Sequence, residues 1–400
     1  MLKRAVRVTA VAASAQLGGT ERVLLDFAAR AFEHDLNLRV LSPRNGPLIA
    51  ILNEIGVPAE VVPASERMLA GSQRPGHLWS LPGSIAGVIA WARALSRHEF
   101  FQDADTIYTV AFKTHLAAAW LRRHPVVWHL HEYPPATTGA GWRMLSRYLP
   151  DAVIANSEAT ARAWGKPVTS VVQNGVDLDR FRPRPKSSWI HQKLGIPREH
   201  RLIGMPAVFA RWKGQLEVIK SFSAVGSRFS DVHLVFVGGS IYDTVAEREY
   251  GKELAAAVAG ERVHLLPFQP KIELVYPELD LVLHYSLRPE PFGRVILEAM
   301  ASSVPVIAAG EGGPVEILVE QGANRQPTTK DREPLSCGWL VPPRDVPALV
   351  QTMRAALSLQ RDQLRAIGAA ARRRAEDHFS ARQFARKVAD VLRGVVLKTP

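Results

Sequence analysis

A loop containing proline and glycine joins an apolar run to a helix-like pattern at Arg288-Pro-Glu-Pro-Phe-Gly-Arg-Val-Ile-Leu-Glu298. The preceding residues 281–284 predict a short strand. Pro291 suits the first turn of a helix, and Val295, Ile296 and Ala299 would supply its apolar face. A strand that passes into a helix through a short loop is the repeating unit of α/β folds with parallel strands.

The same strand-then-helix order recurs on both sides of this loop. In the N-terminal half, a helix is predicted at 20–32 and strands at 5–13, 38–42, 106–110, 126–131 and 152–155. In the C-terminal half, helices are predicted at 215–225 and 248–259 and strands at 202–208, 232–237, 263–266, 281–284 and 304–308. The alternation predicts an α/β protein with a doubly wound unit in each half. A ligand is expected in the cleft between the carboxyl ends of their strands.

Chain length and prolines predict where the domains begin and end. Four hundred residues exceed what a single core normally supports. Residues 181–186, Phe-Arg-Pro-Arg-Pro-Lys, are predicted to be a linker, because closely spaced prolines oppose both helix and sheet. We therefore expect an N-terminal domain at 1–183 and a C-terminal domain at 184–378. A helix at 379–400 could pack back toward the N-terminal domain.

The composition excludes several classes of protein. With 47% hydrophobic and 22% charged residues, the chain is predicted to be soluble and globular. A single cysteine, Cys337, excludes an internal disulfide framework and suits a reducing cytoplasm. No stretch reaches the roughly 18 uncharged apolar residues of a membrane span. Arg7 interrupts the first apolar run, so a signal peptide is not expected.

The loop beginning at Arg288 could bind an anion. Amides at a helix N-terminus lack partners within the helix, and here these amides would belong to Phe292, Gly293 and Arg294. Glu290 lies beside them and Glu298 about two turns into the helix, where each carboxylate could accept a pair of sugar hydroxyls. The alternative is a capped surface helix with two solvated glutamates, and this segment alone does not separate the two interpretations.

This segment resembles the retaining glycosyltransferases of the GT-B fold, specifically glycosyltransferase family 4, the glycosyl transferases group 1. Their signature is two glutamates separated by seven residues around Pro-Phe-Gly, here Glu290-Pro-Phe-Gly-Arg-Val-Ile-Leu-Glu298. Other motifs match in order and spacing: Asn174-Gly-Val-Asp177, Trp212-Lys-Gly-Gln215, Val235-Phe-Val-Gly-Gly239, Gly312-Gly-Pro-Val-Glu316 and Gly338-Trp-Leu-Val-Pro342. The resemblance implies a GT-B architecture, in which two doubly wound Rossmann-like domains face a deep cleft.

The resemblance also implies roles for residues of the donor site. Glu298 would bind the donor ribose hydroxyls and Glu290 the hydroxyls of the transferred sugar, with the Phe292 and Gly293 amides along the sugar and diphosphate. Phe268 follows a predicted strand at the position where the family packs the nucleotide base. A plain core aromatic is the alternative for this residue.

Two cations in Arg211-Trp-Lys-Gly214 are candidates for stabilising the leaving diphosphate, whose charge grows in the transition state. Lys213 occupies the position of the family's lysine. The family's arginine usually stands several residues earlier, where this chain has Val208. Arg211 would therefore reach the site only if the loop is shortened or rearranged. Surface charge on a turn is the alternative for both side chains.

In the N-terminal half, Gly18 and Gly19 follow the first predicted strand, and Thr20 is the expected N-cap of the next helix. By resemblance, this glycine loop would contact the donor diphosphate. His131 and the glutamate after it match the family's His-acidic pair near the reacting sugar. His129 shares the face of His131 by strand alternation, and a structural strand-end histidine is the alternative.

The activity implied by the resemblance is transfer of a sugar from a UDP- or GDP-linked donor to an acceptor hydroxyl, with retention of anomeric configuration. The acceptor would belong to glycan, glycolipid or cell-surface polysaccharide synthesis, and no metal or further cofactor is expected. One alternative is a non-catalytic sugar-nucleotide-binding GT-B protein, which the displaced arginine supports. A Rossmann-type oxidoreductase is another, but it needs a complete glycine fingerprint, which is not evident.

The net charge of +12 suggests an anionic partner. Basic residues are dispersed apart from the arginines at 372–374, and no recognised nucleic-acid module is present, so nucleic-acid binding is not expected. A basic surface suits nucleotide-sugars or an acidic membrane face. We expect a cytoplasmic protein that could contact the inner face of a membrane peripherally, with residues 79–97 as the candidate segment. A helix packed inside the protein is the alternative for that segment.

Overall fold

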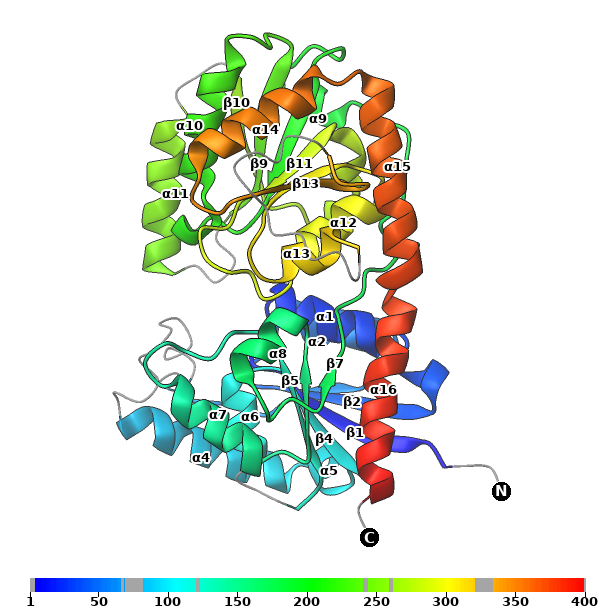
Figure 1. Ribbon diagram of the computed structural model, residues 1–400. Helices are drawn as coiled ribbons and strands as arrows, with labels where there is room; N and C mark the ends of the chain where they lie inside the picture. Colours follow the sequence, from blue (N-terminus) through cyan, green and yellow to red (C-terminus); the bar gives the residue numbers. More distant parts are fainter. Residues whose placement is uncertain are drawn as a thin grey trace. The chain divides into compact units, whose positions relative to one another are not determined.

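The computed structural model describes residues 4–65, 68, 82–119, 123–239, 244–258, 262–320 and 334–398. The chain divides into two compact units (Figure 1). The first unit contains Met1–Gly175 and Ala381–Pro400, and the second contains Val176–Ser380. The predicted linker belongs to the second unit, because Arg184 donates to the Glu273 carbonyl at 2.9 Å and Lys186 to Asp280 at 2.7 Å.

The first unit is built on a parallel sheet whose described strands have the order β3-β2-β1-β4-β5-β6-β7. Val8 of β1 lies opposite Leu38 of β2 on one side and Thr106 of β4 on the other. The strands that the apolar runs predict are present, whereas β3 and β7 are too short to leave a pattern. Their bounds are β1 Val6–Val11, β2 Leu36–Ser42, β3 Ala59–Val61, β4 Thr106–Thr109, β5 Val126–Leu130, β6 Ala152–Ala155 and β7 Ser170–Val171.

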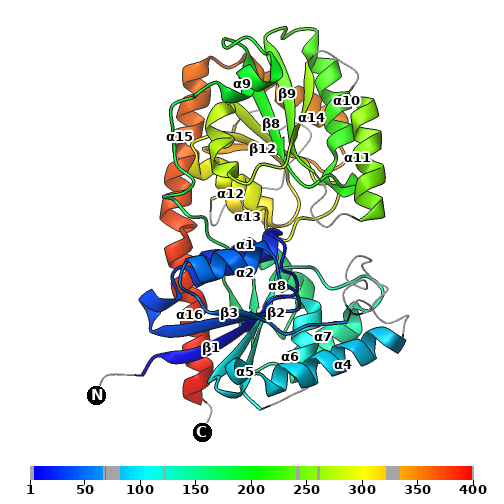
Figure 2. The same ribbon diagram turned by 180° about the vertical axis from the view of Figure 1, so that it is seen from behind.

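Helices cover both faces of this sheet (Figure 2). One buried cluster joins the sheet to α1 Gly19–Ala28, α2 Pro47–Glu54 and α16 Ala381–Lys398. In α16, Phe384, Val388 and Leu392 recur every four residues and are almost fully buried in this cluster. The other cluster joins the opposite face to α4 Pro82–Arg97, α5 Glu99–Gln102, α6 Phe112–Ala119, α7 Gly139–Tyr148 and α8 Glu158–Trp164.

The second unit has its own parallel sheet, with the described strands in the order β10-β9-β8-β11-β12-β13. The strands are β8 Arg201–Pro206, β9 Val232–Gly238, β10 Val263–Pro267, β11 Leu281–His284, β12 Val306–Ala309 and β13 Gly338–Val341. On one face lie α9 Trp189–Leu194, α12 Arg294–Ala301, α13 Gly313–Leu318 and most of α15 Arg361–His378. The other face packs against α10 Gln215–Gly226 and α14 Val346–Ser358. Helix α11 Val245–Ala257 follows β9.

Two doubly wound Rossmann-like units confirm the predicted α/β class. In each sheet the strand order reverses once, between β1 and β4 in the first unit and between β8 and β11 in the second. Loops that leave neighbouring strands at such a reversal run in opposite directions and open a crevice at the carboxyl ends, where ligands of doubly wound folds bind. Among the helices of the described residues, none is long and apolar enough to span a bilayer.

Candidate active site

Lys213 and Glu290 meet at the strand reversal of the second unit. Lys213 lies in a 3₁₀ turn, η3 Arg211–Lys213, that follows β8, and Glu290 lies in the loop after β11. The two loops are joined by a hydrogen bond from the Leu287 amide to the Trp212 carbonyl, at 2.7 Å. The Lys213 Nζ then donates to Glu290 Oε2 at 2.8 Å, and the two side chains are only 13% and 15% exposed. A largely buried ion pair thus lies where a ligand is expected.

Glu290 is held by further donors from the end of β11. The Ser286 hydroxyl donates to Glu290 Oε2 at 2.9 Å, and His284 Nε2 lies 3.5 Å from the same oxygen. Burial alone would raise the pKa of this carboxyl. The Lys213 ammonium, together with the hydrogen bond and charge of His284, outweighs burial and holds the pKa of Glu290 well below its usual range. Glu290 is therefore an ionised acceptor at neutral pH.

The backbone around Glu290 is fixed by the loop after β12. The Gly313 amide donates to the Glu290 carbonyl at 2.9 Å, and Glu290 and Gly312 form a parallel bridge. A Cβ atom at Gly313 would lie 2.3 Å from the Cα and carbonyl oxygen of Phe292. Glycine is therefore required for the close approach of the two loops. The Gly312-Gly-Pro motif acts by holding Glu290 and Phe292 in place.

Helix α12 begins at Arg294, after Gly293 at φ +110°, a conformation that favours glycine. The expectation that Pro291 lies in the first helical turn is therefore wrong, and Pro291 belongs to the loop. Glu298 is only 5% exposed. Its Oε2 accepts from the Tyr276 hydroxyl at 2.7 Å, and its Oε1 lies 3.4 Å from Arg294 Nη2. Both signature glutamates are thus largely buried and held by donors, which excludes two solvated glutamates.

Arg211 and Phe268 are two predicted donor-site residues whose side chains are exposed. The Arg211 side chain is 68% exposed, donates to Glu253 at 3.0 Å and stacks over the Tyr250 ring at 5.4 Å. The structure therefore does not bring Arg211 to the Lys213–Glu290 pair. Phe268 follows β10 and is 43% exposed, which excludes a plain core aromatic and leaves its ring accessible to a ligand.

In the first unit, the glycine loop follows β1 at the strand reversal. Gly18 is the N-cap of α1 and Gly19 its first residue, so Thr20 is not the N-cap. A Cβ at Gly19 would meet nothing within 4 Å, which leaves room beside the loop. Glu21 is 5% exposed at this helix start. Burial, with a contribution from the Glu132 charge, raises the pKa of Glu21 to about 7.

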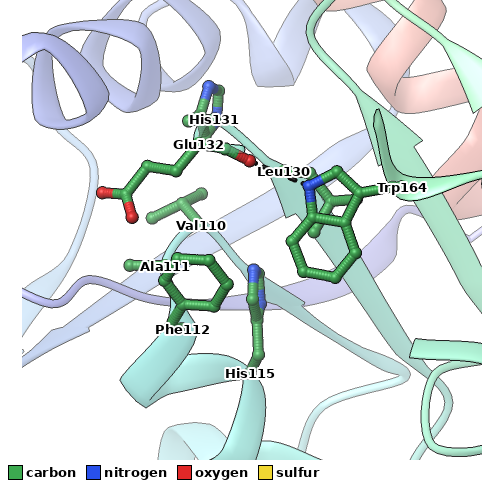
Figure 3. Close-up of a pocket in the computed structure, with 8 residues that line it drawn as sticks. All are labelled: Val110, Ala111, Phe112, His115, Leu130, His131, Glu132 and Trp164. Atoms are coloured by element: carbon green, nitrogen blue, oxygen red, sulfur yellow. Dashed lines mark hydrogen bonds between the residues drawn. The ribbon is translucent and has the colours of Figure 1, made fainter. Parts of the chain in front are cut away.

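The two strand-end histidines have different surroundings. His129 is fully buried, and its Nδ1 lies 2.5 Å from the Tyr108 hydroxyl. Burial and the His131 charge hold the pKa of His129 well below its usual range, so the ring is neutral. His131 lies just beyond the end of β5, with its ring centroid 4.0 Å from that of His129. His131, and not His129, lines a pocket (Figure 3).

This pocket lies at the carboxyl ends of β4 and β5 and has room for about one water molecule. The rings of Phe112, His115 and Trp164 lie around it (Figure 3). Phe112 and Trp164 are stacked with centroids 5.8 Å apart, and Trp164 Nε1 donates to the Glu132 carbonyl at 2.8 Å. The pocket therefore has aromatic walls, and Val110, Ala111, Leu130, His131 and Glu132 complete its lining.

Sequence reasoning missed the residues that hold the signature glutamates. His284, Ser286 and Tyr276 donate to them or lie against them. Gly313 belongs to the Gly312-Gly-Pro-Val-Glu316 motif, but its support of their loop was not predicted. A polar pair at the end of an otherwise apolar strand, His284 and Ser286, was the available signal. Tyr276 lies in a short 3₁₀ turn, which leaves no periodic pattern.

The two Rossmann-like units, with a cluster of carboxylates and a cation at the strand reversal of the second unit, define a two-domain, doubly wound α/β protein. Residues 187–374 match the family model described as Glycosyl transferases group 1, and residues 17–180 match Glycosyltransferase Family 4. A crystal structure of Anabaena Alr3699/HepE in complex with UDP-glucose has a TM-score of 0.76 and 26% identity, covering 97% of this chain and 99% of that one.

Two curated relatives are mannosyltransferases by name. The lipopolysaccharide core biosynthesis mannosyltransferase LpsB of Rhizobium meliloti is 29% identical over 252 residues, which cover 63% of this chain and 68% of that protein. The GDP-mannose-dependent alpha-(1-6)-phosphatidylinositol monomannoside mannosyltransferase of Mycobacterium tuberculosis is 28% identical over 229 residues, 55% of this chain and 54% of that one. The matched segment thus spans about half to two thirds of these relatives.

The chain is therefore a glycosyltransferase group 1 / family 4-like protein. Its fold class is that of the GT-B glycosyltransferases, with two parallel-sheet Rossmann-like units, as predicted. The family models and the similar proteins support a glycosyltransferase enzyme class and a GT-B fold.

Proposed function

We propose that this protein transfers a sugar from a nucleotide diphosphate-sugar to an acceptor hydroxyl, with retention of configuration at the anomeric carbon. The observation that carries the proposal is the Lys213–Glu290 ion pair at the strand reversal of the second unit, followed in the next helix by the buried Glu298. The pair offers a fixed cation for a diphosphate and carboxylates for sugar hydroxyls. A solvent-exposed structural salt bridge would need neither the burial nor the three donors on one carboxylate oxygen.

The donor would lie along the loop and the start of α12. Glu298, oriented by Tyr276, would accept the ribose hydroxyls, and Glu290 would accept hydroxyls of the transferred sugar. The amides of Phe292, Gly293 and Arg294 would face the sugar and diphosphate, since a helix start attracts an anion. The exposed ring of Phe268 would pack on the base. The names of the relatives include UDP-glucose and GDP-mannose, so the proposed donor is UDP- or GDP-linked.

In the proposed step, the bond from the anomeric carbon to the diphosphate oxygen breaks, and its electron pair stays on that oxygen. The acceptor oxygen forms the new bond on the same face of the sugar. Its proton passes to the departing diphosphate. Lys213, which is already held in place, would stabilise the charge that develops on the diphosphate. Stabilisation of developing charge by preorganised groups is usually the largest contribution to catalysis. Arg211 would contribute less to this stabilisation, because its side chain is paired with Glu253.

The first unit would supply the remaining groups. The space beside Gly19 is open, so a phosphate could approach the backbone of this loop there. His131 lines a pocket at the same carboxyl edge and would contact the reacting sugar. The acceptor is proposed to be a glycan, lipid or small molecule, in glycan, glycolipid or cell-surface polysaccharide synthesis. The names of relatives that act on lipopolysaccharide core and phosphatidylinositol mannoside support this class.

We further propose that the reaction needs no metal and no cofactor beyond the nucleotide-sugar. Lys213 and the helix amides would take the role that a divalent cation has in other sugar transferases. The protein is proposed to act in the cytoplasm, with peripheral contact to the inner face of the membrane. Turnover that is unchanged after EDTA treatment would support metal independence, and loss that Mg²⁺ or Mn²⁺ restores would contradict it.

A non-catalytic sugar-nucleotide binder is the second candidate, because one expected cation, Arg211, is paired elsewhere. The two functions differ in turnover. The test measures UDP or GDP release from a panel of UDP- and GDP-sugars, with and without candidate acceptors, after binding of each donor has been measured by calorimetry. Acceptor-dependent release supports the transferase. Binding without release for every donor and acceptor supports the binder, and no binding by any donor contradicts both.

A further inference from the structure

The basic charge of the chain is concentrated in one unit. The first unit contains 23 Lys and Arg against 14 Asp and Glu, a net charge of +9. The second contains 27 against 24, a net charge of +3. Three quarters of the net +12 therefore belongs to the unit that carries His131 and the glycine loop. An anionic partner would be attracted to this unit.

Within the first unit, acidic residues are sparse in a long segment around α7. Between Asp105 and Asp151 the only acidic residue is Glu132. The same segment contains five basic residues, Lys113, Arg122, Arg123, Arg143 and Arg147. Arg123, Arg143 and Arg147 are exposed, whereas Lys113 is buried, so the described surface of this segment carries more basic than acidic charge.

Helix α7 has two contrasting faces. Trp142, 2% exposed, faces the core together with Leu145. On the outer face, Met144 is 59% and Tyr148 64% exposed, at the i,i+4 spacing that places side chains next to each other. Arg143 and Arg147 accompany them and are exposed.

The Arg147 guanidinium lies 5.7 Å from the Tyr148 ring centroid. Among the ion pairs of the described residues, none involves Arg143 or Arg147. Both guanidinium groups are thus available to phosphates, beside the largely exposed side chains of Met144 and Tyr148.

We propose that the outer face of α7, formed by Arg143, Met144, Arg147 and Tyr148, docks on the anionic surface of a phospholipid bilayer. This inference rests on the proposed peripheral membrane contact and names its surface. Guanidinium groups bind phosphate headgroups, while methionine and tyrosine enter the boundary between headgroups and acyl chains. A purely electrostatic partner such as a nucleic acid or an acidic protein would leave the exposed Met144 unexplained.

The position of α7 connects this surface to the candidate site. Trp142, on the inner face, packs against Phe112 with ring centroids 4.5 Å apart, and Phe112 lines the His131 pocket. A helix is about 10 Å across, so a bilayer against α7 would lie roughly one helix diameter from that pocket. An acceptor hydroxyl carried on a lipid headgroup could then reach the first unit without leaving the membrane.

Co-sedimentation with liposomes tests the proposal on the full-length protein. The vesicles contain either phosphatidylcholine alone or phosphatidylcholine with phosphatidylglycerol, at low and high salt. The test variant is Arg143→Glu/Arg147→Glu. The matched control is Arg386→Glu/Lys387→Glu, which makes the same change in net charge on exposed residues of α16 in the same unit. Thermal melts of both variants verify folding.

Wild type is expected to bind the anionic vesicles at low salt. The α7 variant should lose at least about 30-fold in partition coefficient, because each arginine near such a surface contributes roughly a factor of five and each introduced glutamate adds repulsion. The α16 control should lose less than about threefold, since diffuse charge is screened. Met144→Ser/Tyr148→Ser, which keeps the charge, should reduce the binding that remains at high salt.

Equal losses in the α7 and α16 variants would overturn the proposed surface and leave only diffuse attraction. Failure of wild type to bind anionic vesicles would overturn the membrane contact itself. Calorimetric titration of the same preparation with UDP and GDP tests the transferase proposal separately. Nucleotide binding without vesicle binding would contradict the membrane contact and leave the transferase proposal standing.

Discussion

Replacing Lys213 with methionine removes the ammonium group that faces Glu290 and preserves most of the side-chain volume. The two charges are 2.8 Å apart and their side chains 13% and 15% exposed. At an effective dielectric constant of about 20, their attraction is at most ~6 kcal/mol. Removing one partner of a buried pair leaves the other charge buried, which typically costs about 3–5 kcal/mol. We expect Lys213→Met to lower the free energy of unfolding by that amount at neutral pH.

The pH dependence identifies the cause of this loss. The folded pKa of Glu290 lies well below its value in the unfolded chain, about 4.3 for a free glutamate. The ionised group therefore contributes stability above that unfolded value, and the contribution is lost as pH falls through the folded pKa. In Lys213→Met, burial is no longer opposed by the ammonium, so the pKa of Glu290 should rise. The difference in stability between wild type and variant should be largest at neutral pH and shrink on acidification.

A double-mutant cycle measured by urea unfolding provides the assay. Glu290→Gln and Lys213→Met are measured singly and together at neutral pH and near pH 4.5, a point about where the unfolded glutamate titrates. The double variant, with neither charge buried, should be more stable than Lys213→Met alone. A loss below about 1 kcal/mol for Lys213→Met, or strictly additive losses in the double variant, would refute the buried-pair reasoning. Turnover should fall about 100- to 1,000-fold in Lys213→Met.

Three further predictions concern single residues. Gly313→Ala puts a Cβ 2.3 Å from the Phe292 backbone and should lower the free energy of unfolding by about 1–3 kcal/mol; an unchanged melting temperature would contradict the close approach. His233 bonds to two other imidazoles, and burial with their charge lowers its pKa to about 4. The free energy of unfolding should therefore fall by up to about 3 kcal/mol as pH drops from about 6.5 toward 4. His233→Gln should weaken this pH dependence in urea unfolding. The same pH dependence in wild type and variant would contradict a lowered pKa of His233. Arg211→Ala should change turnover less than about threefold, because the side chain is exposed and paired elsewhere; a loss above 100-fold would show that this arginine reaches the diphosphate.

Much of the fold could be predicted because buried parallel strands are short, nearly continuous apolar runs. The bounds of Leu281–His284 and Ala152–Ala155 are those expected from the sequence. Strands of two or three residues, such as Ser170–Val171, contain too few positions for a pattern. The expected boundary at residue 183 differs from the observed one at Gly175, because the proline-rich segment packs on the second unit through its arginine and lysine side chains.

The motif of the candidate site could be predicted from the sequence, but the contacts of its side chains could not. The spacing of Glu290 and Glu298 is local, whereas the Lys213 contact joins residues 77 positions apart. The start of α12 depends on the left-handed conformation of Gly293, so the proline rule failed there. No residue pattern showed that Arg211 would pair with Glu253 on a different helix.

Donor binding by wild type and Glu298→Gln tests the central claim most directly. Calorimetric titration with a panel of UDP- and GDP-sugars is predicted to find at least one donor that binds wild type. Glu298→Gln keeps the size of the buried side chain but removes a charged acceptor, so it should bind that donor about 10- to 100-fold more weakly. Equal binding by the two proteins, or no binding of any donor to wild type, would contradict a nucleotide-sugar site at Glu290 and Glu298.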